Sequence, residues 1–241
     1  MRVSVRELVG FVLRSGDLER AGFVSAQQLT AGTRAHQRVQ QQRPAAYQAE
    51  VPVYHLVERD GLILEIVGRV DGLVAEPERL LLEEIKTTEA ELDPDRVQHA
   101  VHWAQAKVYA WIVATQAGRS SIAVRLTYVR LEPFGQLELE ESYELAELDA
   151  FAEEIVSAYL HWARAYAAWC DRRDATIAAL GFPFAAPRRG QQELMQAAAA
   201  VLEGGGQLFV QAPTGIGKTL SVLLPGVRAL GAGHAEKIFY L

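Results

Sequence analysis

The spacing of apolar and polar residues predicts a β-rich core between residues 50 and 145. Residues 50–58 alternate with the period of two that is typical of a half-buried strand, and residues 62–74 follow after a turn. The remaining predicted strands are residues 79–88, 121–131 and 136–145, and the hairpin turns are Arg59-Asp60-Gly61 and Pro133-Phe134-Gly135. The segment 79–88 is apolar in its first half and charged in its second, so its charged residues emerge from a buried strand.

Four other segments have the three- to four-residue spacing of helices. They are residues 5–14, residues 34–48 with Pro44 as a point where the helix can break, residues 95–117 ending at Gly118, and residues 146–180. In the last of these, Trp162, Tyr166 and Trp169 recur at spacings of four and three residues. Such a stripe is more typical of core packing than of a surface on which nucleobases stack, so we expect these rings to be buried.

The composition changes at Gly181-Phe182-Pro183-Phe184, which has the character of a connector. After it the pattern predicts a helix over 189–203, a strand over 207–212, a helix over 217–230 and a strand over the final residues KIFYL. We therefore expect a first domain over residues 1–145, a helical connector over 146–180, and a different, incomplete domain over 181–241.

Composition and charge exclude several classes of protein. Half of the 241 residues are hydrophobic, enough for a sizeable core, yet no run approaches the ~20 apolar residues of a membrane span. Cys170 is the single cysteine, so disulfides, cysteine zinc sites and an iron–sulfur cluster are excluded within these residues. The net charge of −6 gives no global attraction for nucleic acid, so phosphate contacts need local basic groups. The N-terminus lacks a secretory signal, so we expect a cytoplasmic protein.

Candidate chemistry gathers where two predicted strands end. Asp71 ends the second strand, and Glu84 and Lys86 lie two residues apart on the third, so they share one face. If these strands pair, two carboxylates and an ammonium meet, and such a group can hold Mg²⁺ or Mn²⁺ for phosphodiester hydrolysis. His36, near the start of a predicted helix, is an additional candidate ligand. The pattern alone is short and common, and it also fits a surface ion pair at a strand end.

The ordered set of these residues resembles the RecB-type branch of the PD-(D/E)XK nuclease superfamily. The set is Gly32-x3-His36, Gly68-Arg69-Val70-Asp71-Gly72, Glu84-Ile85-Lys86 and Gln105-x3-Tyr109. The resemblance implies an α/β fold, a mixed sheet flanked by helices, over residues 1–145. It also implies His36, Asp71, Glu84 and the Ile85 carbonyl as metal ligands, Lys86 as a catalytic residue, and Gln105 and Tyr109 on the DNA side. In several members of this branch, an iron–sulfur cluster bound by four cysteines stabilises the domain. These residues contain one cysteine and cannot bind such a cluster.

A second motif lies downstream. The apolar segment 207–212 leads into Ala212-Pro213-Thr214-Gly215-Ile216-Gly217-Lys218-Thr219, the pattern of a P-loop with alanine at its first position. Glycines let consecutive backbone N–H groups point at phosphate oxygens, Lys218 can reach the β- and γ-phosphates of ATP, and the Thr219 hydroxyl can bind Mg²⁺. We expect the start of a RecA-like nucleotide-binding domain.

The segment before this loop indicates which class of nucleotide-binding protein the loop belongs to. Phe182 and Phe184 offer flat apolar surfaces, and the Gln191 amide can bind the edge of adenine. The segment resembles the Q-motif of the XPD/DinG branch of superfamily 2 helicases, which implies Gln191 as an adenine ligand with Arg188 nearby. The chain as a whole resembles the N-terminal portion of bacterial DinG-like helicases that carry a RecB-type nuclease domain.

The expected protein is thus an ATP-dependent helicase with an attached nuclease that acts on single-stranded or forked DNA in DNA repair. We expect these residues to be a piece of a longer chain and not to hydrolyse ATP by themselves. An iron–sulfur cluster could then lie only in the region downstream. Two alternatives stay open. The first domain can be a non-catalytic DNA-binding clamp that feeds the motor, or the P-loop can belong to a nucleotide kinase or switch.

Overall fold

The computed structural model describes residues 1–14, 26–94 and 99–240. The chain divides into two compact units, Met1–Leu160 and His161–Leu241, and the division falls within one long helix. Among the described residues, no helix combines the length and the hydropathy that a bilayer crossing requires.

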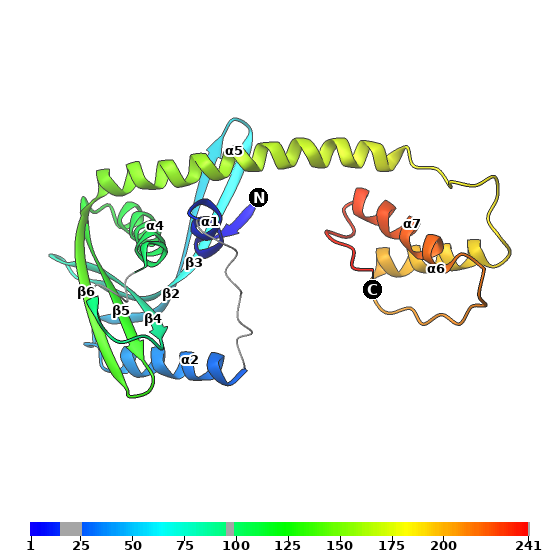
Figure 1. Ribbon diagram of the computed structural model, residues 1–241. Helices are drawn as coiled ribbons and strands as arrows, with labels where there is room; N and C mark the ends of the chain where they lie inside the picture. Colours follow the sequence, from blue (N-terminus) through cyan, green and yellow to red (C-terminus); the bar gives the residue numbers. More distant parts are fainter. Residues whose placement is uncertain (15–25, 95–98, 241) are drawn as a thin grey trace. The chain divides into compact units, whose positions relative to one another are not determined.

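A six-stranded mixed sheet forms the centre of the first unit (Figure 1). Its strands are β1 Arg2–Ser4, β2 Tyr47–Arg59, β3 Leu62–Ala75, β4 Leu80–Thr88, β5 Ser121–Arg130 and β6 Gly135–Glu144. The order is β1-β3-β4-β5-β6, and β2 pairs with β3. The β1–β3 and β4–β5 pairs are parallel, whereas β2–β3, β3–β4 and β5–β6 are antiparallel. Both predicted hairpins and the third strand are confirmed, as is the α/β mixed sheet flanked by helices.

In the described part of the chain, the helices that accompany this sheet are α1 Val5–Val12, α2 Ala26–Gln41, α4 Ala100–Ala117 and the N-terminal part of α5 Leu145–Ala178. Because neighbouring residues of a strand face opposite sides, Ile85 and Glu84 of β4 meet different helices. Ile85 packs with Ala35 and Val39 of α2, whereas Glu84 accepts a hydrogen bond from Gln105 of α4. The two helices therefore cover opposite faces of the sheet, as Figure 1 shows.

Several helix boundaries differ from the prediction, and α2 begins at Ala26 rather than at residue 34. The second predicted helix ends at Gln41, and β2 begins at Tyr47, because the chain turns before Pro44, whose ring cannot be accommodated inside a helix. The long predicted helix from residue 95 begins at Ala100 in the described residues. His99 before it has extended backbone angles (φ −120°, ψ 129°) and forms its N-cap. Residues 95–98 of that prediction lie outside the described residues.

The second unit contains the C-terminal part of α5 and two further helices, α6 Gln191–Gly204 and α7 Lys218–Gly231. Residues 207–212 and 237–240, both predicted as strands, belong to no strand in the described structure, and Phe209 is 89% exposed. An extended segment becomes a strand only by pairing its backbone groups with a neighbour. In the described part of this unit, no such ladder forms, so apolar character alone was a misleading signal.

The aromatic stripe of α5 is also placed differently from the prediction. Trp162, Tyr166 and Trp169 are 37%, 43% and 48% exposed, so these rings are not core residues. They stack on one another instead, with ring centroids 5.2 Å and 5.8 Å apart. The spacing identified one helical face correctly, but the rings on that face are exposed rather than buried.

Candidate metal centre

The candidate site lies where β3 and β4 diverge. Their antiparallel ladder ends at the pair Gly72–Glu83, and the next residues in the same register are Asp71 and Glu84. Opposite residues of an antiparallel pair project to the same face, so the two carboxylates are neighbours. The backbone N–H of Ile85 donates to Asp71 Oδ2 at 2.7 Å, which fixes one oxygen of Asp71 at β4. The pairing of β3 with β4, on which the predicted site depends, is therefore present.

Glu84 forms a closed polar triangle with Lys86 and Gln105. Its Oε1 accepts hydrogen bonds from Lys86 Nζ at 2.7 Å and from Gln105 Nε2 at 2.9 Å. Lys86 Nζ also donates to Gln105 Oε1 at 3.0 Å. The other oxygen, Glu84 Oε2, is buried and has no hydrogen-bond partner among the described residues. A buried carboxylate oxygen without a donor is costly, so this atom is suited to a cation.

Burial dominates the electrostatics of Glu84, whose residue surface is only 4% exposed. Loss of hydration and the nearby charge of Asp71 raise its pKa, Lys86 and His36 oppose the rise, and the net pKa is about 7. Such an environment disfavours a bare carboxylate and favours one that shares its charge with a proton or a metal ion.

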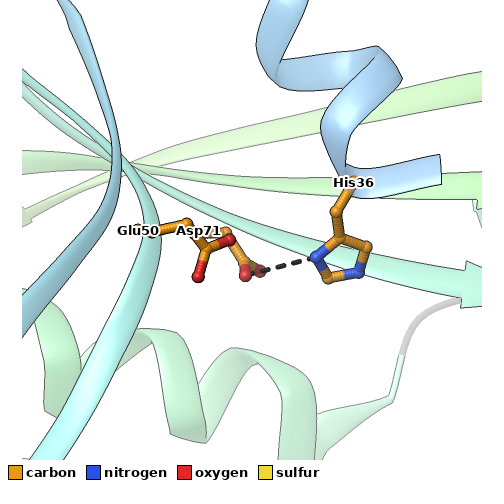
Figure 2. Close-up of side chains that lie close together, drawn as sticks. All are labelled: His36, Glu50 and Asp71. Atoms are coloured by element: carbon orange, nitrogen blue, oxygen red, sulfur yellow. Dashed lines mark ion pairs between the residues drawn. The ribbon is translucent and has the colours of Figure 1, made fainter. Parts of the chain in front are cut away.

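His36 and Glu50 complete the arrangement around Asp71. His36 Nδ1 of α2 lies 3.3 Å from Asp71 Oδ1, and the hydrogen bond to Asp71 raises the pKa of the imidazole despite its burial. One ligand atom from each of His36, Glu50 and Asp71 lies within 4.8 Å of the others (Figure 2). Sequence reasoning missed Glu50. Only the β2–β3 register, which places residue 50 between the pairs 49–72 and 51–70, shows that it faces Asp71.

Two tyrosines explain the glycines that flank Asp71. A Cβ at Gly68 would overlap the ring of Tyr109, and a Cβ at Gly72 would overlap the ring of Tyr47. Tyr109 hydrogen-bonds to Gln105 and to the backbone of Arg69, while burial raises the pKa of its hydroxyl to about 12. The Gly-x3-Gly spacing around Asp71 therefore leaves room for ring packing on β3.

Glu83, the neighbour of Glu84, belongs to a different network. It is almost fully buried and pairs with Arg43, which also pairs with Glu138 at 2.7 Å. Thr127 Oγ1 donates to the same Glu83 carboxylate. Because Glu83 faces the side of β4 opposite to Glu84, its role is to tie the segment after α2 to the sheet.

A family model described as the PD-(D/E)XK nuclease superfamily matches residues 12–176, which is more than half of the chain. The chain belongs to the PD-(D/E)XK nuclease superfamily. A solved structure described as the crystal structure of SSO0001 is similar, with 17% identity and a TM-score of 0.43, over 65% of this chain and 75% of that chain. These values are too low to add an argument, so the assignment rests on the family model. No curated protein matches the chain.

The donor set fits the divalent metal that PD-(D/E)XK nucleases typically use. Carboxylate oxygens are the ligands that Mg²⁺ and Mn²⁺ prefer, and one imidazole is compatible with Mn²⁺. Asp71 lies beside His36 and accepts from the Ile85 N–H next to Glu84, whereas the ligand atoms within 4.8 Å of one another belong to His36, Glu50 and Asp71 and not to Glu84. Gln105 and Tyr109 lie beside Glu84 on the α4 side. The catalytic and ligand roles of these residues stay predictions.

The predicted nucleotide loop lies in the second unit. Gly215 and Gly217 have positive φ values of 84° and 89°, and Gly217 is the N-cap of α7, which begins at Lys218. Lys218 Nζ donates to the Ala212 carbonyl at 2.8 Å, so the ammonium folds back across the loop. Other loop contacts join Arg188 to the Gly215 carbonyl, Gln191 to the Gly217 carbonyl, and Thr219 to Tyr240. The matched family region ends before this loop, so helicase membership and ATP binding stay predictions.

Proposed function

We propose that this chain is a divalent-metal-dependent nuclease that hydrolyses phosphodiester bonds of DNA. The observation that carries the proposal is the buried Glu84 carboxylate, which has one oxygen bound by Lys86 and Gln105 and one oxygen without a donor. His36, Asp71, Glu84 and the Ile85 carbonyl would hold the ion. A metal bound there would lower the pKa of a water molecule and neutralise charge that develops on the phosphate.

Lys86 contributes a positive charge that is already oriented. Its ammonium has three donors, and two of them are used by Glu84 and Gln105. The third can donate to a phosphate oxygen or to the attacking water, without any reorganisation of the side chain. Hydrolysis then adds water across one phosphorus–oxygen bond, and the leaving oxygen takes up a proton.

Gln105 and Tyr109 support this geometry from α4. Gln105 holds both Glu84 and Lys86, so its amide fixes the distance between the acid and the amine. Tyr109 packs against Gly68 and hydrogen-bonds to Gln105, which places its ring beside the same triangle. We propose that both residues face the DNA, which is single-stranded or forked.

A cleavage assay tests the nuclease. The purified chain is incubated with labelled single- and double-stranded DNA and Mn²⁺ or Mg²⁺, beside Lys86→Ala and the control Lys237→Ala, which changes a lysine outside the site. We expect Lys86→Ala to lose about 100-fold or more of the cleavage rate, as for removal of one charge-stabilising donor. Equal rates for Lys86→Ala and the wild type would refute the assignment of Lys86. No cleavage of any substrate by the wild type would favour the alternative, a non-catalytic DNA-binding clamp.

We also propose that residues 181–241 belong to an ATP-binding helicase motor of the DinG type. Three observations support this: the positive φ values of Gly215 and Gly217, the position of Lys218 and Thr219 at the first turn of α7, and the burial of Gln191 against Gly217. Backbone N–H groups at such a helix start can bind phosphate oxygens. Binding of a fluorescent ATP analogue should fall in Lys218→Ala and persist in Lys237→Ala. Equal binding in the two variants would remove this assignment.

A further inference from the structure

His102 lies in the first turn of α4, on the helical face that carries Gln105. Residues three apart on a helix are neighbours on its surface, so His102 is adjacent to the amide that holds Lys86. The strand neighbour of Lys86 is Tyr128 of β5, and the Tyr128 hydroxyl lies 3.0 Å from His102 Nδ1. The imidazole therefore lies beside the Lys86 end of the candidate site, although it belongs neither to the predicted metal ligands nor to the predicted DNA-side residues.

The hydrogen bonds around Tyr128 determine which nitrogen of His102 carries the proton. The His99 carbonyl accepts hydrogen bonds from the backbone N–H groups of His102 and Trp103 at the start of the helix. Burial raises the pKa of Tyr128, and a hydrogen bond from the His99 backbone opposes that rise. A backbone group that lowers the pKa of a phenol donates to its oxygen, so the His99 N–H donates to Tyr128.

The Tyr128 hydroxyl then has one proton left to donate. The residue is only 1% exposed, and His102 Nδ1 is an acceptor within reach of the hydroxyl. We therefore assign the proton of this hydrogen bond to Tyr128, which leaves Nδ1 as the acceptor. A neutral imidazole whose Nδ1 accepts carries its own proton on Nε2.

The Nε2–H group of His102 is thus a donor that can reach a ligand. No residue in the described part of the chain accepts a hydrogen bond from it. The ring is half-buried, and Nε2 is not one of the fully buried polar atoms that lack a partner. A ligand can accept from Nε2 without breaking a hydrogen bond within the protein.

The charges that act on the His102 imidazole are positive. Burial, and then the charges of Lys86, His99 and Arg6, lower the pKa of His102 to about 4, so the ring is neutral at neutral pH. Arg6 reaches this point from α1, which packs against α4, and its side chain is exposed. In a chain of net charge −6, this is a local group of basic residues of the kind that phosphate contacts need.

We propose that His102 binds a phosphate of single-stranded DNA through its Nε2–H, with Arg6 supplying a positive charge beside it. Hydrogen bonds to a charged acceptor such as phosphate are stronger than those between neutral groups. The inference rests on the proposed function for the nature of the ligand, because DNA is the polyanion that the proposed nuclease must hold. Lys86 is proposed to act at the phosphate that is hydrolysed, so a phosphate on His102 orients the DNA strand beside it.

Two substitutions of His102 separate contact with DNA from a structural role. In His102→Asn, the amide oxygen takes the place of Nδ1 and can still accept from Tyr128, but nothing replaces Nε2. In His102→Gln, an amide N–H takes the place of Nε2. Binding of labelled oligothymidylate to the whole chain is measured by fluorescence anisotropy in a chelator, which prevents metal-dependent cleavage. The matched control is His234→Gln, an exposed histidine of the second unit.

We expect His102→Asn to weaken DNA binding by about 10-fold, as for the loss of one hydrogen bond to a charged group. His102→Gln and the control should bind like the wild type. A structural role would give the opposite order, because only the asparagine keeps the contact with Tyr128. Equal binding by His102→Asn and the wild type, or weaker binding by His102→Gln than by His102→Asn, would overturn the inference.

The salt dependence of binding distinguishes the neutral donor from the cation. Arg6→Ala should weaken binding and reduce the slope of log affinity against log salt by about 0.7, the value for one phosphate contact on a single strand. His102→Asn should weaken binding with an unchanged slope, because a neutral donor releases no counterion. A reduced slope in His102→Asn would mean that the ring binds as a cation, and would overturn the assignment of the proton.

Binding and cleavage are measured separately, so the two proposals can fail independently. The expected order of the variants, together with no cleavage by the wild type in Mn²⁺, would refute the nuclease and leave the phosphate contact of His102 standing. Cleavage by the wild type, together with unchanged binding in His102→Asn, would overturn this inference and leave the nuclease standing.

Discussion

Replacing Glu84 with glutamine isolates the effect of its charge. The amide oxygen of the glutamine can still accept from Lys86 and Gln105, and the amide nitrogen takes the place of the oxygen that has no donor. The volume of the side chain hardly changes. We therefore expect the metal-free variant to fold, and to be more stable than the wild type at alkaline pH.

The direction and size of this effect follow from the pKa of Glu84, which rises from 4.5 to about 7 in the folded protein. Because the folded protein holds the proton more tightly, the contribution of Glu84 to stability is complete below pH 4.5 and is lost as the pH rises through 7. The difference corresponds to about 3 kcal/mol of free energy of unfolding, at ~1.4 kcal/mol for each pH unit.

The measurement is urea unfolding of both proteins, followed by tryptophan fluorescence, in a chelator and across the pH range from about 5 to about 8. We expect the free energies of unfolding to differ by less than about 1 kcal/mol near pH 5 and by about 3 kcal/mol in favour of Glu84→Gln near pH 8. Saturating Mn²⁺ should then stabilise the wild type more than the variant, because a bound ligand stabilises only the state that binds it.

Two results would refute this reasoning. If Glu84→Gln were less stable than the wild type at every pH, the carboxylate would be a structural ion-pair partner of Lys86 rather than a desolvated ligand. If the stability difference did not change with pH, the pKa of Glu84 would not be raised by burial. The control Glu58→Gln, an exposed change on β2, should show no difference at either end of the range.

The remaining predictions concern packing and buried charge. Gly68→Ala should lower the free energy of unfolding by about 1–3 kcal/mol in urea titrations, because its Cβ would overlap Tyr109. Gly10→Ala, whose added Cβ meets no neighbour in the middle of α1, should raise it by about 0.5–1 kcal/mol, and a loss of stability there would contradict the packing argument. Arg43→Ala should destabilise by about 3–5 kcal/mol, because it leaves Glu83 buried without its charge partner. Adding Glu83→Gln to Arg43→Ala should restore part of that loss, and no recovery would mean that Arg43 acts through packing alone.

Local sequence patterns predicted most strand positions of the first unit correctly. Alternation of apolar residues located β2 and β3, and the apolar start of β4 placed Glu84 and Lys86 at the end of a buried strand. Hydrophobic period and turn chemistry act over a few neighbouring residues, so they can be read directly from the chain. The same patterns gave wrong strands at 207–212 and 237–241 where these residues are described, because a strand also needs a partner that no local pattern reports.

The sequence by itself determined which chemical groups are available: the carboxylates of Asp71 and Glu84, the ammonium of Lys86 and the imidazole of His36. Only the tertiary structure decided which of them meet. The β2–β3 register brought Glu50 next to Asp71. The alternation along β4 placed Glu83 on the face opposite to the site, and the packing around α5 leaves Trp162 37% exposed. The physical reason is that register and coverage depend on contacts between residues far apart in the chain, and a shift of one residue moves a side chain to the opposite face of the sheet.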